Sequence, residues 1–262
     1  MITGNTRIFF MLADPIHHVR TPEVLNPLFR ARGIDAVMVP VHYAPADFAA
    51  AWQAMKRMRN LGGMVVSVPL KEQALELADR VGAEAQELGA ANTVRREADG
   101  TMVAENFDGR GFLQGLLGGG ADAQGREALL LGAGGAGRAI AFGLARSGVA
   151  SLRVHDPDAA RAQSLADRIA AGYPQLRVSA GPNDLDGVDL LVNASPCGLH
   201  PETDPAPVDL SRLRPEILVA DIIMKPRETP LLRAAQDKGC QVRHGAPMLD
   251  CQLELMLEFF GL

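Results

Sequence analysis

Leu131-Gly132-Ala133-Gly134-Gly135-Ala136-Gly137-Arg138 is the stretch of sequence that decides the fold. An apolar run, 128–131, comes before it, and a segment with helical periodicity, 138–147, follows it. In a strand–turn–helix unit, three glycines at this spacing allow a tight turn, close approach of the backbone to a pyrophosphate, and close packing of the helix on the strand. The amide groups at the start of the helix and the helix dipole attract phosphates. We therefore predict a dinucleotide-binding turn, with Gly132, Gly134, Gly135, Ala136 and Gly137 as binding residues.

The next apolar run, 151–155, is followed by Asp156. At this position of a Rossmann unit, a carboxylate accepts hydrogen bonds from the ribose hydroxyls of NAD and repels the 2′-phosphate of NADP. Arg161 is near enough in the sequence to attract that phosphate, or it lies on the helix surface. The sequence favours NAD as the cofactor, with NADP as the less favoured alternative.

Composition and charge exclude several classes of protein. Of the 262 residues, 47% are apolar and 22% are charged, and the net charge of −5 provides no broad basic surface. We expect neither nucleic acid nor a membrane as a partner, because no apolar run approaches the ~20 residues that cross a bilayer. The three cysteines show no paired spacing. We therefore expect no disulfide framework, no metal site and a cytoplasmic location.

Strand-like and helix-like segments alternate along the chain, which is typical of α/β proteins with mostly parallel sheets. In the first part we expect strands at 7–12, 36–41 and 64–68. We also expect three helices: one that Thr21 caps, one at 45–59 and one at 70–81. A hairpin near 92–103 interrupts the alternation, which resumes at 128 and ends in an amphipathic helix, 248–260. We predict two domains. Residues 1–112, with 245–262, form a mostly parallel α/β substrate domain, and residues 113–244 form a Rossmann-type dinucleotide-binding domain.

Polar residues recur at the expected loops of the first domain. Lys71 follows a strand and Pro69 at the start of a helix, where the helix dipole disfavours a cation. An isolated lysine of this kind is most often a solvated surface residue. Asp108 precedes Gly109, a pair that is common in ordinary turns. Neither residue by itself indicates a site.

Six groups of residues occur in one order along nearly the whole chain. They are Ser67, Pro69 and Lys71; Gly89-Ala90-Ala91-Asn92-Thr93; Asn106, Asp108, Gly109, Gly111 and Phe112; Val192-Asn193-Ala194-Ser195-Pro196-Cys197-Gly198; Asp221, Pro226 and Thr229-Pro230-Leu231-Leu232; and Gly245-Ala246-Pro247-Met248-Leu249 with Gln252. Together they resemble the shikimate/quinate dehydrogenase family. Because so many matches occur in order, we predict that Lys71 and Asp108 are functional residues and not an ordinary surface lysine and turn aspartate.

The resemblance implies reversible hydride transfer between a nicotinamide and a hydroxyl-bearing ring carbon of a small cyclic hydroxy acid. Lys71 would be the general acid and base, and Asp108 would orient it. Substrate contacts would come from Thr21, Ser67, Asn92 and Gln252. Cofactor contacts beyond the glycine turn would come from Asp156, Asn193, Ser195 and Gly245, the last of which leaves room for the nicotinamide. The chain would act as a monomer or a homodimer.

Four positions depart from the pattern of the family. Val19 stands where a serine of the carboxylate-binding loop is usual, and Met224 stands where a tyrosine is usual. Val65 and Phe107 replace an asparagine and a threonine. We place Val19 and Met224 in the candidate substrate site as points of altered specificity, and Arg20, His17 or His18 could compensate for the lost donors.

The sequence leaves the substrate open. Shikimate, quinate, another cyclohexane or cyclohexene carboxylate and a less polar polyol are all compatible with it. Two alternatives are a site that has changed to dehydration or hydrolysis with NAD retained, and a non-catalytic sensor of NAD or a metabolite. The presence of both Lys71 and Asp108 favours an enzyme.

Overall fold

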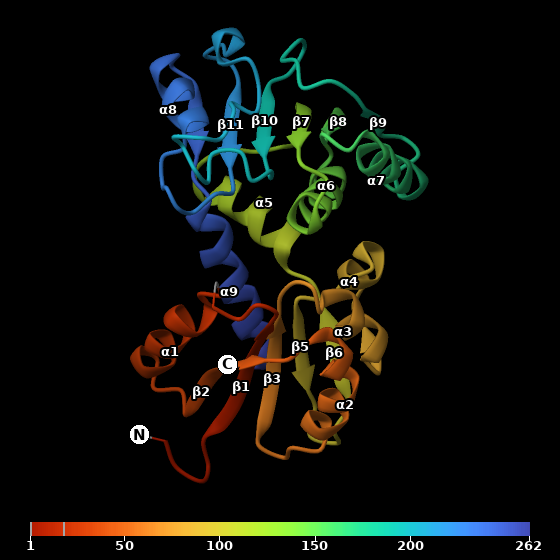
Figure 1. Ribbon diagram of the computed structural model, residues 1–262, viewed down its shortest axis with the longest axis vertical. Coiled ribbons are helices and arrows are strands. Elements are labelled where there is room, and N and C mark those ends of the chain that lie inside the picture. The colour runs from red at the N-terminus through yellow and green to blue at the C-terminus, as the bar shows by residue number, and fades with distance from the viewer. Residues whose placement is uncertain (1, 18) are drawn as a thin grey trace. The chain divides into compact units, whose positions relative to one another are not determined.

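The computed structural model describes residues 2–17 and 19–262, so His18 lies outside the described residues. The chain forms two compact units. Unit 1 extends to Phe107 and resumes at Leu253, and unit 2 comprises Asp108–Gln252. This division falls a few residues before the boundary expected after residue 112, and it divides the last helix between the units. The predicted α/β class is confirmed, with one sheet in each unit (Figure 1).

The sheet of unit 1 has the strand order β2-β1-β3-β5-β6-β4. The neighbours β2, β1 and β3 are parallel, as are β6 and β4, whereas β3, β5 and β6 are antiparallel to one another in turn. The strands are β1 (Arg7–Ala13), β2 (Ala36–His42), β3 (Leu61–Val66), β4 (Arg80–Val81), β5 (Thr93–Arg96) and β6 (Met102–Glu105). The helices are α1 (Thr21–Ala31), α2 (Pro45–Lys56), α3 (Lys71–Leu77) and α4 (Ala83–Leu88).

The two faces of this sheet carry different cores. On one face, Phe48 and Trp52 of α2 pack with Met64 of β3 and with apolar residues of α3 and α4. On the other face, the Phe9 ring lies between Phe29 of α1 and Phe260, with ring centroids 5.9 and 4.8 Å away. Both faces of β3 are therefore covered, and all six of its residues are buried.

Three local expectations for unit 1 were wrong. The helix expected at 70–81 ends at Leu77, and Arg80–Val81 forms the short strand β4, because pairing with β6 outweighs the local helical pattern. Strand β3 begins at Leu61 and includes Gly62-Gly63, so Ser67 lies just beyond its end. Thr21 is the first residue of α1 and not its cap, since Arg20 holds the N-cap position and provides no side-chain cap.

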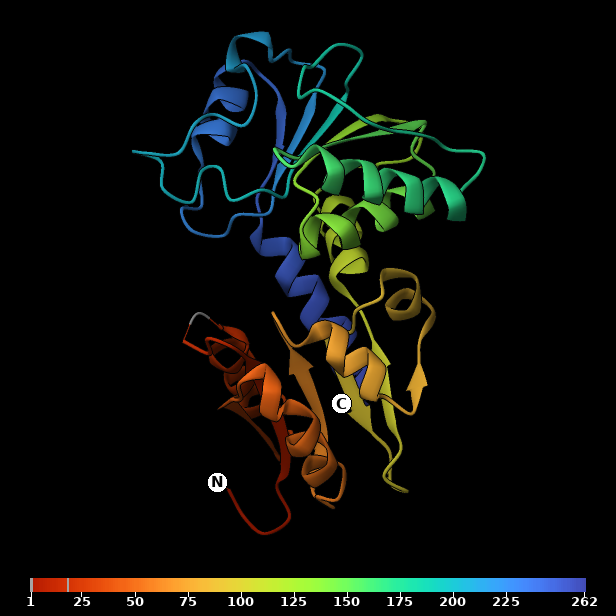
Figure 2. The ribbon, with the colours of Figure 1, turned by 45° about the vertical axis from the view of Figure 1, so that its right-hand side comes forward.

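Unit 2 is built on a fully parallel sheet with the strand order β12-β11-β10-β7-β8-β9. The strands are β7 (Glu127–Leu131), β8 (Ser151–His155), β9 (Arg177–Ala180), β10 (Leu190–Asn193), β11 (Leu218–Asp221) and β12 (Gln241–Arg243). The helices are α5 (Asp108–Gly118), α6 (Gly135–Ser147), α7 (Ala159–Gly172), α8 (Pro230–Asp237) and α9 (Ala246–Phe260), with a 3₁₀ turn at Leu210–Arg212. Figure 2 shows α6 and α7 side by side along this sheet.

The parallel arrangement gathers the ends of β7, β8, β10 and β11 at one edge of the sheet, which is where ligands bind in open α/β sheets. Residues 128–131 of β7 and all of β10 and β11 are buried, as expected for central strands covered on both faces. Of the helices in the described part of the chain, none combines the length and the apolar character that a membrane-spanning helix requires.

Candidate functional site

The glycine turn follows β7 directly and has the geometry that its spacing predicts. Gly132 has a φ of +100°, which an L side chain rarely adopts, and its amide donates to the His155 carbonyl at 2.7 Å. A Cβ at Gly132 would lie 2.8 Å from the Ala194 carbonyl oxygen, and a Cβ at Gly137 would overlap the Gly132 carbonyl. These two glycines hold β7, α6 and the loop after β10 in close contact.

The middle of the turn is open, which is the feature that fits a dinucleotide. A Cβ at Gly134 or Gly135 would meet no atom within 4 Å. Helix α6 begins at Gly135, and its N-cap residue Gly134 has no side chain to occupy the helix terminus. The positive end of the helix dipole and the amides of the first turn can therefore receive a pyrophosphate at short range.

Asp156 lies just after β8 and beside this turn. Its Oδ2 accepts a hydrogen bond from the Ala133 amide at 2.9 Å, and its Oδ1 accepts one from the Asp158 amide at 2.9 Å. Arg161 Nη1 lies 3.5 Å from Asp156 Oδ1, and Arg161 Nη2 lies 3.5 Å from Asp158 Oδ2. The side chain of Asp156 is only 8% exposed, so these contacts fix the carboxylate in one orientation.

A pocket of about 560 Å³ opens beside Asp156, within the size range of small-molecule and cofactor sites. Its walls come from the glycine turn, the end of β8 with the start of α7, and the loops after β9 and β10. The lining residues are Leu131, Gly132, Gly134, His155, Asp156, Pro157, Asp158, Arg161, Asn183, Ala194, Ser195, Pro196, Cys197, Pro205, Ala206 and Pro207. The residues present therefore fit the adenosine half of a nicotinamide dinucleotide.

The sequence did not single out the outer wall of this pocket. Asn183 Nδ2 donates to the Pro207 carbonyl at 2.8 Å and so holds the Pro205–Pro207 segment in place. Asp204 Oδ2 accepts from the Gly198 and His200 amides at 3.0 and 2.8 Å, and these bonds lower the pKa of its carboxyl group. No local signal in the sequence indicated that residues 205–207 line the pocket.

A buried polar cluster supports the loop after β10. Asn193 Oδ1 accepts from the Ser195 amide and hydroxyl at 3.1 and 2.6 Å, and Asn193 Nδ2 donates to Asp221 Oδ2 at 3.1 Å. Asp221 also accepts from Thr229 Oγ1 at 2.8 Å and from the Ile223 amide at 3.0 Å. Burial raises the pKa of the Asp221 carboxyl group, and its hydrogen bonds oppose that shift. Asn193 and Ser195 thus stand in a preorganised network beside the pocket.

Two further candidates of unit 2 are Gly245 and Met224. A Cβ at Gly245 would overlap the Ile222 carbonyl, so only glycine fits there whatever the neighbouring site binds. Met224, in the loop between β11 and α8, is 37% exposed. Gln252 Nε2 donates to Asp108 Oδ1, and both residues are at least nine-tenths buried. The structure therefore brings these two candidate residues together within unit 2.

In unit 1, the loop after β3 carries Ser67 and leads to Lys71. The Ser67 amide donates to the Leu12 carbonyl at 2.8 Å, and its carbonyl accepts from the Leu70 amide at 3.0 Å. Lys71 is the first residue of α3, and its carbonyl accepts from the Ala91 amide at 2.9 Å. This last bond ties the Lys71 backbone to the segment that precedes Asn92.

Asn92 is 2% exposed and its amide group is held by neighbours from unit 1. Its Oδ1 accepts from the Phe107 amide at 3.1 Å and from Thr93 Oγ1 at 2.8 Å. Two of the departures from the family lie beside Asn92: Phe107 through this hydrogen bond, and Val65 through the neighbouring Thr93. Phe107 is 3% exposed, and Val65, which pairs with Thr93 in the sheet, is 4% exposed.

The loop before α1 holds the remaining candidates of unit 1. Thr21 is 9% exposed in the first turn of the helix, and Val19 is partly buried. Arg20 forms an ion pair with Glu23 at 3.6 Å, on the surface. Among residues 2–17 and 19–262, no three His, Cys, Asp or Glu side chains are grouped to hold a metal ion.

Comparison with known proteins gives consistent matches over the whole chain. Residues 11–94 match the family model for the shikimate dehydrogenase substrate binding domain. A shikimate dehydrogenase (NADP(+)) of Geobacter metallireducens is 35% identical over 98% of this chain and 91% of its own length.

Two solved structures show how far the similarity extends. Shikimate 5-dehydrogenase from Listeria monocytogenes, in complex with shikimate and NAD, superposes with a TM-score of 0.93 at 28% identity, over 99% of this chain and 93% of the other. Quinate dehydrogenase from Corynebacterium glutamicum, in complex with NAD, superposes with a TM-score of 0.90 at 30% identity, over 98% and 94% of the two chains.

Proposed function

The chain belongs to the shikimate dehydrogenase family and is an NAD(P)-dependent oxidoreductase, and on that basis we propose that it transfers a hydride between NAD and a hydroxyl of a shikimate- or quinate-like ring acid. We further propose that unit 1 binds the ring acid, that unit 2 binds the dinucleotide, and that the protein works in the cytoplasm as a monomer or homodimer. The observation that carries the proposal is the pocket beside Asp156, because it combines an open glycine turn with an oriented carboxylate.

The preference for NAD rests on charge. The Asp156 carboxylate faces the position where a ribose would be recognised, and a 2′-phosphate there would meet a buried negative charge. Arg161 does not supply a free cation for that phosphate, because it lies between the carboxylates of Asp156 and Asp158. The two carboxylates offset the positive charge that Arg161 would offer to a 2′-phosphate.

The bound dinucleotide supplies the hydride acceptor. Lys71 takes the hydroxyl proton on its Nζ while the alcohol becomes a ketone, and it returns that proton in the reverse direction. In unit 1, Asn92, Ser67 and Thr21 offer polar groups to the ring substituents. In unit 2, Asp108 and Gln252 form the hydrogen-bonded pair that we assign to the same reaction.

The direct test is a substrate screen followed at the absorbance of the reduced nicotinamide. Purified protein is mixed with NAD or NADP and with shikimate, quinate and related cyclohexane and cyclohexene carboxylates. We expect reduction of NAD by at least one ring acid, with a lower kcat/KM for NADP. Binding of NAD without reduction by any acid would contradict the proposal, and product analysis would then separate a hydrolase or dehydratase from a sensor.

A further inference from the structure

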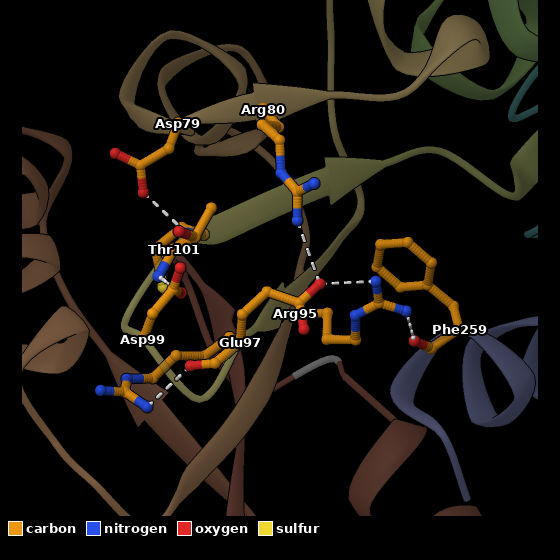
Figure 3. Close-up of polar contacts among 9 residues, drawn as sticks. Asp79, Arg80, Arg95, Glu97, Asp99, Thr101 and Phe259 are labelled. Carbon is orange, nitrogen blue, oxygen red and sulfur yellow. Dashed lines mark hydrogen bonds and ion pairs between the residues drawn. The ribbon is translucent and has the colours of Figure 1, made fainter.

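Arg95 of β5 makes three contacts with its surroundings in unit 1. Its Nη1 donates to the Phe259 carbonyl at 2.6 Å, and its Nη2 donates to Glu97 Oε1 at 2.7 Å. Its guanidinium carbon lies 4.7 Å from the centroid of the Phe259 ring. Figure 3 shows the guanidinium group between the Glu97 carboxylate and the last turn of α9. A single side chain therefore fixes both the backbone and the ring of Phe259.

Glu97 holds Arg95 in this position. Its Oε1 is shared with Arg80, whose Nη2 lies 3.2 Å away, so a cation from β5 and a cation from β4 meet at one carboxylate (Figure 3). The Glu97 backbone is fixed in turn by the hairpin, since its amide donates to the Thr101 carbonyl at 2.8 Å. A planar guanidinium group presents its donors in a fixed fork and can stack on an aromatic ring, whereas an ammonium group is a compact point charge without that geometry.

Phe259 transmits this restraint to Phe107. The two rings pack edge to face, with centroids 5.4 Å apart and an interplanar angle of 67°. The Phe107 amide donates to Asn92 Oδ1 at 3.1 Å. Phe107 is also the last residue of unit 1 before the chain continues into unit 2 at Asp108. The series of contacts from Arg95 therefore ends at the side-chain amide of Asn92 and at the residue that precedes Asp108.

We propose that Arg95 is a positioning residue for the reaction, which acts through Phe259 and Phe107 on the orientation of Asn92. The inference rests on the proposed function, in which Asn92 binds the ring acid. A guanidinium group over an aromatic ring and a hydrogen bond to the adjacent carbonyl each restrict the ring. Without them, Phe259 keeps only its apolar packing, and the Phe107 amide loses the support that aims it at Asn92.

The test compares Arg95→Met, Arg95→Lys and Phe259→Leu with the matched control Arg96→Met. Arg96 is the next residue of β5, and it binds the backbone carbonyls of Lys56 and Glu97 at 2.8 and 3.0 Å. Its loss therefore removes neither the donor to the Glu97 carboxylate nor the donor to the Phe259 carbonyl, both of which belong to Arg95. Amide hydrogen exchange of Phe107, measured by NMR, reports the contact series without any catalysis. Initial rates with shikimate and NAD report its effect on the reaction.

We expect exchange at Phe107 to be about tenfold faster in Arg95→Met and Phe259→Leu, and the KM for shikimate to rise by about tenfold while the KM for NAD stays within twofold. Arg95→Lys should fall between Arg95→Met and the wild type, because it keeps the charge and loses the paired donors. The Arg96→Met control should leave both the Phe107 exchange and the KM for shikimate unchanged, even if its melting temperature falls.

Two results would overturn the inference. One is unchanged exchange at Phe107 in Arg95→Met, and the other is an equal rise in the KM for shikimate in Arg96→Met. If none of the ring acids supports the reduction of NAD by the wild type, the proposed function is contradicted independently of this inference. The exchange at Phe107 then still decides whether Arg95 acts on Asn92.

Discussion

The two candidate sites differ in how their polar residues are supported. In unit 2, Asn193 hydrogen-bonds to both Ser195 and Asp221, and Asp156 is held by two backbone amides. In unit 1, the polar candidates stand near positions that are apolar here, such as Val65 and Phe107, which are buried. The candidate dinucleotide site is built by backbone geometry and a buried polar network, whereas the candidate substrate site of unit 1 depends on individual side chains.

This difference explains why the sequence predicts the dinucleotide more closely than it predicts the ring acid. A pyrophosphate site needs glycines where the backbone turns and approaches the ligand, and few other residues can replace them. A ring acid is recognised by donors and acceptors at particular positions, and one substitution can change the preferred substrate while the fold persists. Variants in the two units should therefore change different kinetic constants.

Lys71→Ala should have the largest effect. Loss of the general acid and base should reduce kcat by about 10²–10⁴-fold with the best ring acid found in the screen. Because Lys71 belongs to unit 1 and the candidate dinucleotide pocket is lined by residues of unit 2, the Kd for NAD should stay within about twofold. Stopped-flow or steady-state rates measure the first quantity, and calorimetric titration with NAD measures the second.

Lys238→Ala is the matched control, since Lys238 is an exposed lysine at the end of α8. It should leave both constants unchanged. Near-normal turnover in Lys71→Ala would remove the proposed role of Lys71 and would leave unit 1 with no identified proton carrier.

Asp156→Ser should have the next largest effect, this time on the cofactor. It removes the acceptor for the ribose hydroxyls and frees Arg161 from one carboxylate, so the ratio of kcat/KM for NAD to that for NADP should fall by about a hundredfold. Asp158→Ala is the comparison variant, because Asp158 also pairs with Arg161 but mainly caps α7. It should cost about 1 kcal/mol of stability and change the cofactor ratio much less. An NADP preference in the wild type would contradict the assignment.

Much of the fold was accessible from the sequence, because strong periodicity and glycine spacing act locally. The glycine turn, β7, β8 and α6 lie where the pattern of residues 128–155 placed them, although α6 begins at Gly135 and not at Arg138. The pattern failed where distant residues decide the structure. Gly62 lies within β3, which pairs with β1, and a Cβ at this position would overlap the Phe9 ring.

The same distinction applies to the candidate sites. The sequence predicted Asp156 from its position after a strand and Asn193 from the family resemblance, and the structure shows both in hydrogen-bonded settings. It could not find Asn183 or Pro207 as parts of the pocket wall, because their contact joins two irregular loops 24 residues apart. Nor could it show that Arg95 contacts Phe259, which is 164 residues further along the chain.

The buried network of unit 2 can be tested by pH. Asp221→Asn removes an acceptor for Thr229 and Asn193 and should lower the free energy of unfolding by about 1–3 kcal/mol near pH 4. Burial raises the pKa of Asp221 in the folded protein above its unfolded value, so the folded state binds the proton more tightly. The contribution of Asp221 is then largest below the unfolded pKa, and it declines as the pH rises through the raised pKa. The loss of unfolding free energy caused by Asp221→Asn should therefore be smaller at pH 7 than at pH 4, which urea unfolding can measure.

Asp209→Asn supplies a control of opposite sign. Hydrogen bonds from Ser211 lower the pKa of Asp209, which is exposed at the start of the 3₁₀ turn. Its contribution is present above the unfolded pKa and is lost as the pH falls, so any deficit of Asp209→Asn should grow with pH. A deficit of Asp221→Asn that also grows with pH would show that the Asp221 carboxyl group is not destabilised by burial.

Val19→Ser should have the smallest effect and is the sharpest test of the difference between the units. A hydroxyl at this position would restore a donor for the substrate carboxylate, and a hydrogen bond to a charged group is worth about 1.5–3 kcal/mol. We expect kcat/KM for shikimate to rise by about tenfold, with the KM for NAD unchanged. Val24→Ser, the same substitution at a partly buried position of α1, is the matched control and should not raise it. Equal rates in Val19→Ser and the wild type would mean that another group, such as Arg20, already binds the carboxylate, and the specificity of unit 1 would then depend on Val65 and Phe107.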